Sequence, residues 1–293
     1  MPVFVILHYL SAEMTCRCVD TLKSTFSGEN YHIVIVENGS PNDSGRILKE
    51  KYGDLDNCAI LFAPQNLGFA KGNNLGYQYA REHLDPEFVI VMNNDVLVED
   101  PGFLEKVRKI HAETGFFVLG PDIYACNADF HQNPMRQEGY TKEQVTSIIR
   151  ARKRWLSVYP LHFFYTRSLT WAKGVVKKLL GRKPKPLTNP LSIRRLEDPV
   201  LHGACYIFSK AFLSARQEAF DPGTFLYFEE DILHYICKKN GYLMVYDPSL
   251  SVTHLEDVST NTAYRSEYRK RKMKYQNLVR SATVLLEKME ADL

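Results

Sequence analysis

Short apolar runs alternate with amphipathic segments through the first hundred residues of the chain. Between the runs, apolar side chains recur about every four positions, as Cys18, Leu22 and Phe26 do, and this spacing predicts helices. Continuous apolar runs are typical of strands that are buried on both faces. Such runs occur at 3–7, 33–36, 59–62 and 88–92. Strands separated by helices predict an α/β fold with a central, mostly parallel sheet.

The second half of the chain predicts fewer strands and more helices. Ordered chain is expected to resume at 202–208 after the basic stretch, and a last strand is indicated at 243–246. His254 is expected in a loop after the last strand. A helix is expected at 229–239, ended by Gly241, and another at 264–289. We therefore expect a single α/β domain over 1–262, with an insertion at about 130–196, and a basic C-terminal helix over 263–293.

Polar clusters follow four of the predicted strands. They begin after Leu7, Val36, Phe62 and Met92. The carboxyl ends of parallel strands meet at one edge of a sheet, and ligands bind outside that edge. A shared ligand site explains the clusters better than unrelated turns do.

Three single residues in these places carry candidate chemistry. Asp95 follows Asn93 and Asn94, and such oxygen ligands suit Mg²⁺ or Mn²⁺. Taken alone, the tripeptide favours an Asx turn. Glu37 could accept hydrogen bonds from a nucleobase or a ribose, or it could cap a loop. His254 could bind a metal or a phosphate, although a lone histidine is more often a surface or core residue.

The segment 66–74 places two glycines, Lys71 and several amides before a predicted helix. Backbone N–H groups at a helix start attract phosphate, and a lysine adds charge. The segment matches neither the Gly-x-Gly-x-x-Gly fingerprint nor a Walker loop. A flexible connection is the alternative interpretation.

Three consecutive acids, Glu229, Glu230 and Asp231, open the helix expected at 229–239. At about 100° per residue, Glu229 lies on the side of the apolar positions and Glu230 at its edge. Asp231 points the other way, where an acid simply complements the helix dipole. An acid directed towards the interior needs a partner or a chemical role.

Composition excludes several classes of protein. The chain has 293 residues, of which 45% are hydrophobic and 24% charged, so it is not a disordered tail, a collagen or a coiled coil. No apolar stretch approaches about 20 residues, which predicts no membrane span. The first residues lack the pattern of a signal peptide and are expected to form a strand. Six scattered cysteines without a Cys-x-x-Cys pair predict reduced thiols in a cytosolic protein.

The net charge of +3 conceals an asymmetry. No acid occurs between Glu143 and Glu197, yet that stretch holds 13 of the 37 basic residues. The rest of the chain therefore carries 24 basic and 34 acidic residues, which is a net charge of −10. Aromatic residues lie among these basic ones: Trp155, Phe163, Phe164, Tyr165 and Trp171. This mixture favours an anionic lipid surface over a nucleic acid. A solvated helical insertion is the alternative, and a second basic run at 265–274 could share the surface.

Taken in order, several motifs resemble one family. The first strand ends in His8-Tyr9, and the motifs continue at 37–40 (ENGS), 66–74 (NLGFAKGNN), 93–96 (NNDV), 202–204 (HGA), 228–233 (FEEDIL), 239–242 (KNGY), and His254 with Ser259. Together they resemble the inverting nucleotide-sugar glycosyltransferases of family 2, which have the GT-A fold. The resemblance covers roughly 1–125 and 200–262 and is nearest to bacterial polysaccharide and rhamnosyltransferase-like members.

The resemblance implies a role for each matching residue. Contacts to the donor nucleotide are implied for His8, Tyr9, Glu37, Asn38, Asn66, Lys71 and Asn94. Metal ligands are implied at Asp95, Asn93 and His254, acceptor contacts at His202, Gly203 and Asp231, and the catalytic base at Glu230 or Glu229. The chain departs from the family in three places, one of which is Ile232, where many members have a further Asp. Asn93 stands at the first acidic position of the Asp-x-Asp motif, and Glu230 at the second position of a Glu-Asp pair.

The implied reaction uses a nucleoside-diphosphate sugar, Mn²⁺ or Mg²⁺, and a hydroxyl of a glycan or a lipid-diphosphate-linked acceptor in surface polysaccharide synthesis. A carboxylate removes the hydroxyl proton, and one displacement inverts the anomeric centre. The expected location is cytoplasmic, with peripheral attachment at the inner face of the membrane as an option. A homo-oligomer is left open, and no nucleic-acid partner is expected.

Two other functions compete with this interpretation. A sugar nucleotidyltransferase usually has a Gly-rich loop after its first strand, but residues 8–13 contain no glycine. A non-catalytic subunit that binds carbohydrate or nucleotide is compatible with Asn93 and the altered acid pair. Turnover of a nucleotide sugar with Mn²⁺ or Mg²⁺ separates it from an enzyme.

Overall fold

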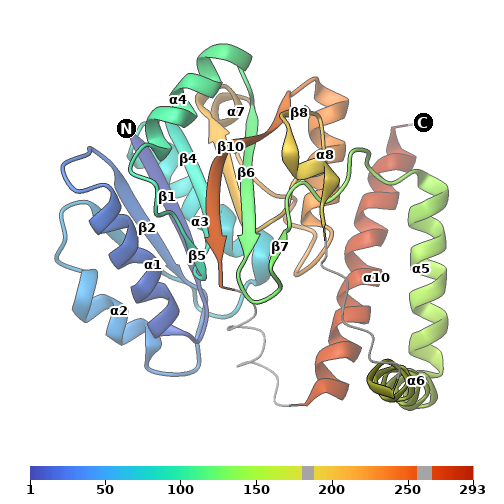
Figure 1. The fold of residues 1–293 in the computed structure, drawn as a ribbon. Helices are drawn as coiled ribbons and strands as arrows, with labels where there is room; N and C mark the ends of the chain where they lie inside the picture. The colour runs from blue at the N-terminus through green and yellow to red at the C-terminus, as the bar shows by residue number, and fades with distance from the viewer. Residues whose placement is uncertain (180–187, 256–265, 293) are drawn as a thin grey trace.

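The computed structural model describes residues 1–179, 188–255 and 266–292. In these residues a single ten-stranded sheet lies at the centre, with helices on both faces (Figure 1). Its strands are β1 (Pro2–His8), β2 (His32–Glu37), β3 (Cys58–Phe62), β4 (Phe88–Asn93), β5 (Val96–Leu97), β6 (Val118–Ala125), β7 (Phe130–His131), β8 (Leu196–Glu197), β9 (Cys205–Ser209) and β10 (Met244–His254). The helices are α1 (Ala12–Thr25), α2 (Ser44–Tyr52), α3 (Gly68–His83), α4 (Phe103–Thr114), α5 (Lys142–Ser157), α6 (Tyr159–Leu179), α7 (Lys210–Ala215), α8 (Glu229–Asn240) and α10 (Glu267–Ala291), with a 3₁₀ turn, η1, at Pro190–Ile193.

The strand order is β3-β2-β1-β4-β9-β6-β10-β5, with β7 beside β6 and β8 beside β10. The first four strands pair in parallel, and so do β6 and β10. The strand β9 is antiparallel to both β4 and β6, which leaves six strands running in one direction. The predicted α/β fold with a mostly parallel sheet is confirmed, and the opposing strands other than β9 are only two residues long.

The two faces of the sheet pack into separate cores because side chains alternate along each strand. In β1, Phe4 and Ile6 join a cluster with α1, α2 and α4, whereas Val3 and Val5 join one with α3, α7 and α8. This burial on both faces explains why the strands appear in the sequence as unbroken apolar runs.

Helix α3 begins earlier than the sequence predicts. The segment 66–74 was expected to be a loop, but the helix starts at Gly68 and includes Lys71. Glycines make this close approach to the sheet possible: a Cβ at Gly72 would lie 2.6 Å from Leu7, and one at Gly76 would lie 2.4 Å from Val5. The start of α3 is thereby held against the carboxyl ends of β1 and β2.

Strand β10 is longer than expected, and His254 is its last residue and not part of a loop. The strand was expected to end at Tyr246, and Pro248 follows two residues later. The structure accommodates it in an irregularity between Asp247 and Ser251, after which pairing with β6 resumes. The extension matters because it carries His254 to the edge of the sheet where the carboxyl ends of the parallel strands meet.

Helices α5, α6 and α10 form a group beside the sheet (Figure 1). Val145 and Ile149 of α5, Ala282 and Leu285 of α10, and Ile232 of α8 share one apolar cluster. The helical nature of the expected insertion and of the C-terminal segment is therefore confirmed, whereas the domain boundaries stay predictions. Ser259, Arg265 and the side chain of Trp171 lie outside the described residues. Of the helices that the structure describes, none is long and apolar enough to cross a membrane.

Candidate active site

The polar clusters expected at the strand ends do meet at one edge of the sheet. In the parallel register, His8 lies opposite Glu37, and Leu7 lies opposite Asn93. Strand β10 brings His254 to the same end, next to Val96. Four segments distant in sequence therefore supply one polar surface at the carboxyl ends of the strands.

His8 is completely buried and connects two loops. Its Nδ1 lies 2.7 Å from the Thr15 hydroxyl and its Nε2 lies 2.9 Å from the Ser44 hydroxyl. The amide of Asn94 donates to the same Thr15 hydroxyl at 2.9 Å. Burial lowers the pKa of His8 to about 4, so the ring is neutral at pH 7. These contacts favour a supporting role for His8 and Asn94. Thr15 and Ser44 were not identified from the sequence.

Glu37 forms the loop cap that the sequence offered as one of two alternatives. Its carboxylate accepts hydrogen bonds from the backbone N–H groups of Ser40 at 2.6 Å and Gly39 at 3.2 Å. An aromatic residue missed in the sequence, Phe62, ends β3 nearby and is 51% exposed. A Cβ on Gly45 would touch both the Glu37 side chain and the Phe62 ring. The Glu37 carboxylate, a hydrogen-bond acceptor, and the exposed ring of Phe62 therefore lie on either side of Gly45.

Asn38 and Asn66 fix the start of α3. Asn38 Oδ1 accepts from the Leu67 N–H at 2.9 Å, and Asn66 Oδ1 accepts from the Gly68 N–H at 2.8 Å. Both amides thereby satisfy backbone donors at the helix start. Lys71 is exposed one turn into the helix. Tyr9 is half-buried in the loop after β1, where its carbonyl accepts from the Ser11 N–H at 2.8 Å.

Asp95 and His254 form the pair that the sequence predicted as a metal site. The Asp95 Oδ1 lies 3.3 Å from His254 Nε2. The other ring nitrogen of His254, Nδ1, lies 2.7 Å from the acceptor Oε1 of Gln132, so it carries the proton. In a neutral ring Nε2 then presents a lone pair towards the carboxylate, and a cation between them relieves that repulsion. Asn93 is half-buried beside them.

The spacing of Asp95 and His254 suits a divalent cation. Adjacent ligands of an octahedral Mg²⁺, each about 2.1 Å from the metal, lie about 3 Å apart. Within the described residues, no group of three or more His, Cys, Asp or Glu side chains could hold a metal. Further ligands would therefore have to come from amides, water or a bound diphosphate.

A strained turn introduces the acidic pair. Tyr227 and Phe228 both have positive φ angles, of 73° and 70°, directly before α8. Consecutive non-glycine residues in this region are costly and cluster at functional sites. The turn is supported by α10, because the Ser281 hydroxyl donates to the Leu226 carbonyl at 3.1 Å. It directs Glu229 and Glu230 to the first turn of the helix.

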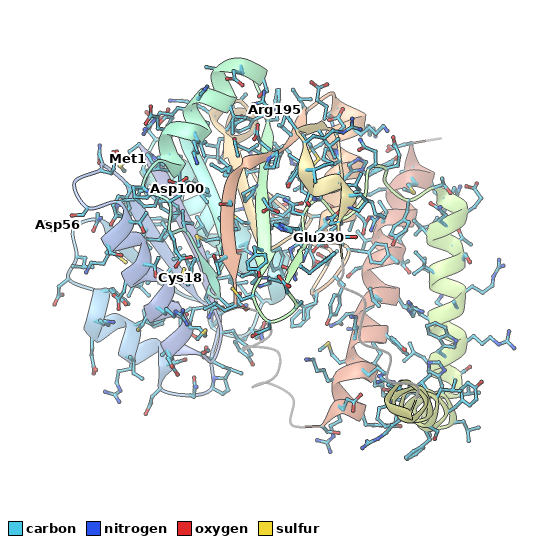
Figure 2. All side chains as sticks on the ribbon, in the orientation of Figure 1. Met1, Cys18, Asp56, Asp100, Arg195 and Glu230 are labelled. Atoms are coloured by element: carbon cyan, nitrogen blue, oxygen red, sulfur yellow. The ribbon has the colours of Figure 1, made fainter. Side chains whose placement is uncertain are left out.

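Glu230 contacts the segment that follows β8. A Cβ on Gly203 would lie 2.6 Å from Glu230 Oε1, and a hydrogen bond from the Gly203 backbone reaches the carboxylate. Figure 2 shows Glu230 in the region between the sheet and the α5–α10 helices. The next residue back, His202, has its ring centre 6.0 Å from that of His254. A continuous series of contacts therefore leads from Glu230 to Asp95.

The two glutamates differ in their surroundings. Glu229 is 4% exposed, and its Oε1 has no hydrogen-bond partner among the described residues. Glu230 is half-buried beside Gly203. Burial raises the pKa of both carboxyl groups, and the adjacent carboxylate adds to the increase in each. Burial also lowers the pKa of His202 to about 4, so its ring is neutral.

Asp231 is buried, which contradicts the expectation that it points to solvent. It forms an ion pair with Arg136, whose guanidinium also lies 4.0 Å from the centre of the Tyr140 ring. Asp231 is buried because residues 138–141 and α10 lie against the side of α8 that the helical pattern assigned to water. Burial raises the pKa of Asp231 to about 6 despite the arginine. Asp231 lines a cavity of about 380 Å³ bounded by α8, α10 and residues 138–141.

The chain has a fold of the GT-A type, as two solved structures show. A solved structure of GalNAc-T7 with UDP, GalNAc and Mn²⁺ aligns over 92% of this chain and 49% of that one, with a TM-score of 0.57 and 12% identity. S. aureus TarS 1-349 in complex with UDP-GlcNAc aligns over 90% of this chain and 62% of that one, with a TM-score of 0.53 and 15% identity.

The chain belongs to glycosyl transferase family 2, whose family model matches residues 3–179. The match ends before α8, so it does not reach the acidic pair. A curated relative, the low-salt glycan biosynthesis hexosyltransferase Agl10 of Haloferax volcanii, is 27% identical over 119 residues. That alignment covers 41% of this chain and 35% of the length of the relative.

Proposed function

We propose that the protein is an inverting glycosyltransferase that moves a hexose from a nucleoside-diphosphate sugar to a hydroxyl group of a glycan or lipid-linked acceptor. Membership of family 2 and the hexosyltransferase relative support sugar transfer. The UDP and UDP-GlcNAc in the solved relatives support the class of donor. Synthesis of a bacterial surface polysaccharide is the proposed setting.

One observation carries the proposal: a series of contacts links the Glu230 carboxyl group to Asp95, the acid that follows β4. The contacts run through Gly203, His202 and His254. Sugar transfer needs a base for the acceptor hydroxyl and a separate group near the leaving diphosphate. Glu230 is the more accessible of the two glutamates and is assigned as the base. Glu229, which is 4% exposed, is the alternative base.

In the proposed reaction, Glu230 removes the proton of the acceptor hydroxyl. The oxygen attacks the anomeric carbon from the face opposite the diphosphate. The bond from that carbon to the diphosphate oxygen breaks, and the diphosphate leaves with the electron pair. The products are a glycoside of inverted configuration, a nucleoside diphosphate and a proton on Glu230. General-base help of this kind contributes about 10²–10⁴-fold to the rate.

Asp95 and His254 are assigned to a Mn²⁺ or Mg²⁺ ion, with Asn93 beside them. The ion, when bound, neutralises charge that develops on the departing diphosphate. The hydrogen bond to Gln132 holds His254 in the tautomer whose Nε2 faces Asp95. Glu37 and the exposed ring of Phe62 are assigned to the nucleobase, and Lys71 to the phosphates.

A thermal-shift screen of nucleotide sugars, each with and without Mn²⁺ or Mg²⁺, tests the proposed function. A donor at about 100 times its dissociation constant stabilises a protein by about 2.7 kcal/mol, which raises the Tm by several degrees. We expect such a shift with one class of sugar nucleotide, and only when metal is present. Absence of any shift, together with absence of nucleoside diphosphate release, would contradict the proposal.

A further inference from the structure

Helix α6 carries an exposed apolar stripe. Leu161 is 75% exposed, Phe164 64%, Tyr165 65% and Leu169 40%. Spacings of three, four and eight residues place these four side chains on one face of the helix. Large exposed hydrophobic side chains are otherwise scattered over the described surface, at positions such as Ile47 and Ile193. A concentrated stripe of this kind marks an interaction surface.

The opposite face of α6 is already occupied. Phe163 is 3% exposed and packs against Tyr268 of α10, with ring centres 5.0 Å apart. The Tyr159 hydroxyl donates to the Tyr268 carbonyl at 2.9 Å. Trp155 stacks on His162 at 4.8 Å. Phe163 and Trp155 therefore belong to the helix packing, which corrects the expectation that they face a membrane.

Exposed basic side chains lie on α6 itself and on the end of α5 that directly precedes it. Arg150, Lys153 and Arg154 near the end of α5 are exposed, and so is Arg167 within α6. Among the ion pairs of the described residues, none includes any of these four. The sequence from 144 to 196 contains no acid that could neutralise them. The surface therefore combines apolar contact with uncompensated positive charge.

The surface also lies at the functional end of the molecule. Figure 1 shows α6 at the end towards which the carboxyl ends of β6 and β10 point. Helix α10 connects the two places: Arg271 lies 5.0 Å from the ring centre of Phe163, and Lys274 lies 5.4 Å from that of Tyr227. Tyr227 belongs to the strained turn that introduces the acidic pair.

We propose that the apolar stripe of α6, together with the basic residues around it, docks the protein on an anionic phospholipid bilayer. Aromatic and aliphatic side chains enter the headgroup region, while long basic side chains reach the lipid phosphates. The charge argues against a second copy of the chain, because two such surfaces face to face would bring like charges together. The consequence for catalysis, delivery of a lipid-linked acceptor to the acidic pair, rests on the proposed function. The docking itself does not.

Flotation of the purified full chain with lipid vesicles tests the proposal without donor or acceptor, so its failure leaves the proposed sugar transfer untouched. Vesicles of phosphatidylcholine are compared with vesicles that also contain phosphatidylglycerol. We expect binding to the anionic vesicles at low salt. Binding should be lost when added salt shortens the screening length from about 10 Å to about 3 Å.

Matched variants identify the surface. Reversing two charges, Arg150→Glu with Arg154→Glu, should reduce partitioning by more than about 25-fold, because loss of each basic residue alone costs about fivefold and each new carboxylate is repelled as well. Leu161→Ser with Phe164→Ser should reduce it about tenfold or more. The controls Lys109→Glu with Lys49→Glu, and Ile193→Ser, alter exposed residues elsewhere and should bind like the parent protein.

Three results would overturn the proposal. The first is no binding to anionic vesicles at low salt, and the second is equal loss of binding in the controls and the α6 variants. The third comes from light scattering: a dimer of the parent protein that Leu161→Ser with Phe164→Ser converts to a monomer, with vesicle binding unchanged, would assign the stripe to a second copy.

Discussion

Replacing Gly203 with alanine should slow sugar transfer by displacing the Glu230 carboxylate. The added Cβ would lie 2.6 Å from Glu230 Oε1, whereas ordinary contact begins at 3.4 Å. The carboxylate must therefore retreat by about 0.8 Å, because the opposing atom belongs to a side chain that can move. A displacement of about 1 Å in a catalytic group costs about 100-fold in rate. We expect kcat to fall roughly 30-fold or more.

Steady-state release of nucleoside diphosphate from the donor found in the thermal-shift screen measures this effect. Gly102→Ala is the matched control, since its Cβ would meet no atom closer than 3.3 Å and it caps α4 away from the site. Gly203→Ala should retain the metal-dependent thermal shift with donor, because Glu230 acts on the acceptor.

A double-mutant cycle decides whether Gly203 acts through Glu230. In a Glu230→Gln background, which already lacks the base, Gly203→Ala should cost little further rate. Unchanged kcat in the single variant would refute the reasoning. So would a full 30-fold loss in the Glu230→Gln background, because the glycine would then serve the acceptor directly.

Three further predictions follow from the same contacts. Asp95→Ala should abolish the metal-dependent part of the donor thermal shift, and a shift equal to that of the parent protein would remove Asp95 from the metal site. Turnover should rise from about pH 5 to about pH 8, because the raised pKa of the acidic pair keeps the base protonated at lower pH; a flat profile would contradict this. Arg136→Met should lower the free energy of unfolding by about 2 kcal/mol near pH 8. The loss should be smaller near pH 5, because Asp231, with its pKa of about 6, is protonated there. Equal losses at both pH values, measured by urea denaturation, would refute this prediction.

The sign of the Arg136 effect follows from the direction of the Asp231 pKa. Its folded value of about 6 lies above the ordinary value of 3.8, so Asp231 costs stability as pH rises through this window. Arg136 reduces that cost. Removing the arginine therefore matters only where Asp231 is ionised. The expected loss is smaller than that for a fully buried ion pair because the Arg136 side chain is 28% exposed.

The sequence predicts the sheet well because strands buried on both faces need unbroken apolar runs. It also places Asp95, Glu37 and Asn38 at one edge, since parallel strands must end together. These inferences depend only on neighbours along the chain and on the rule that strands alternate with helices.

Contacts between distant residues were beyond the reach of such reasoning. Asp231 meets Arg136, 95 residues away, and His254 meets Gln132, 122 residues away. A helical pattern cannot show that residues 138–141 and α10 lie against the second side of α8. Nor does Pro248 in the sequence show that β10 continues beyond it. Each missed feature is a long-range packing event.

The most direct test of the central claim compares Glu230→Gln with Glu229→Gln for donor binding and for turnover. Both changes remove a charge while preserving shape. We expect Glu230→Gln to keep the metal-dependent thermal shift with donor yet to lose about 100-fold or more in nucleoside diphosphate release in the presence of acceptor. Substantial turnover in both variants would show that the base does not lie at the start of α8.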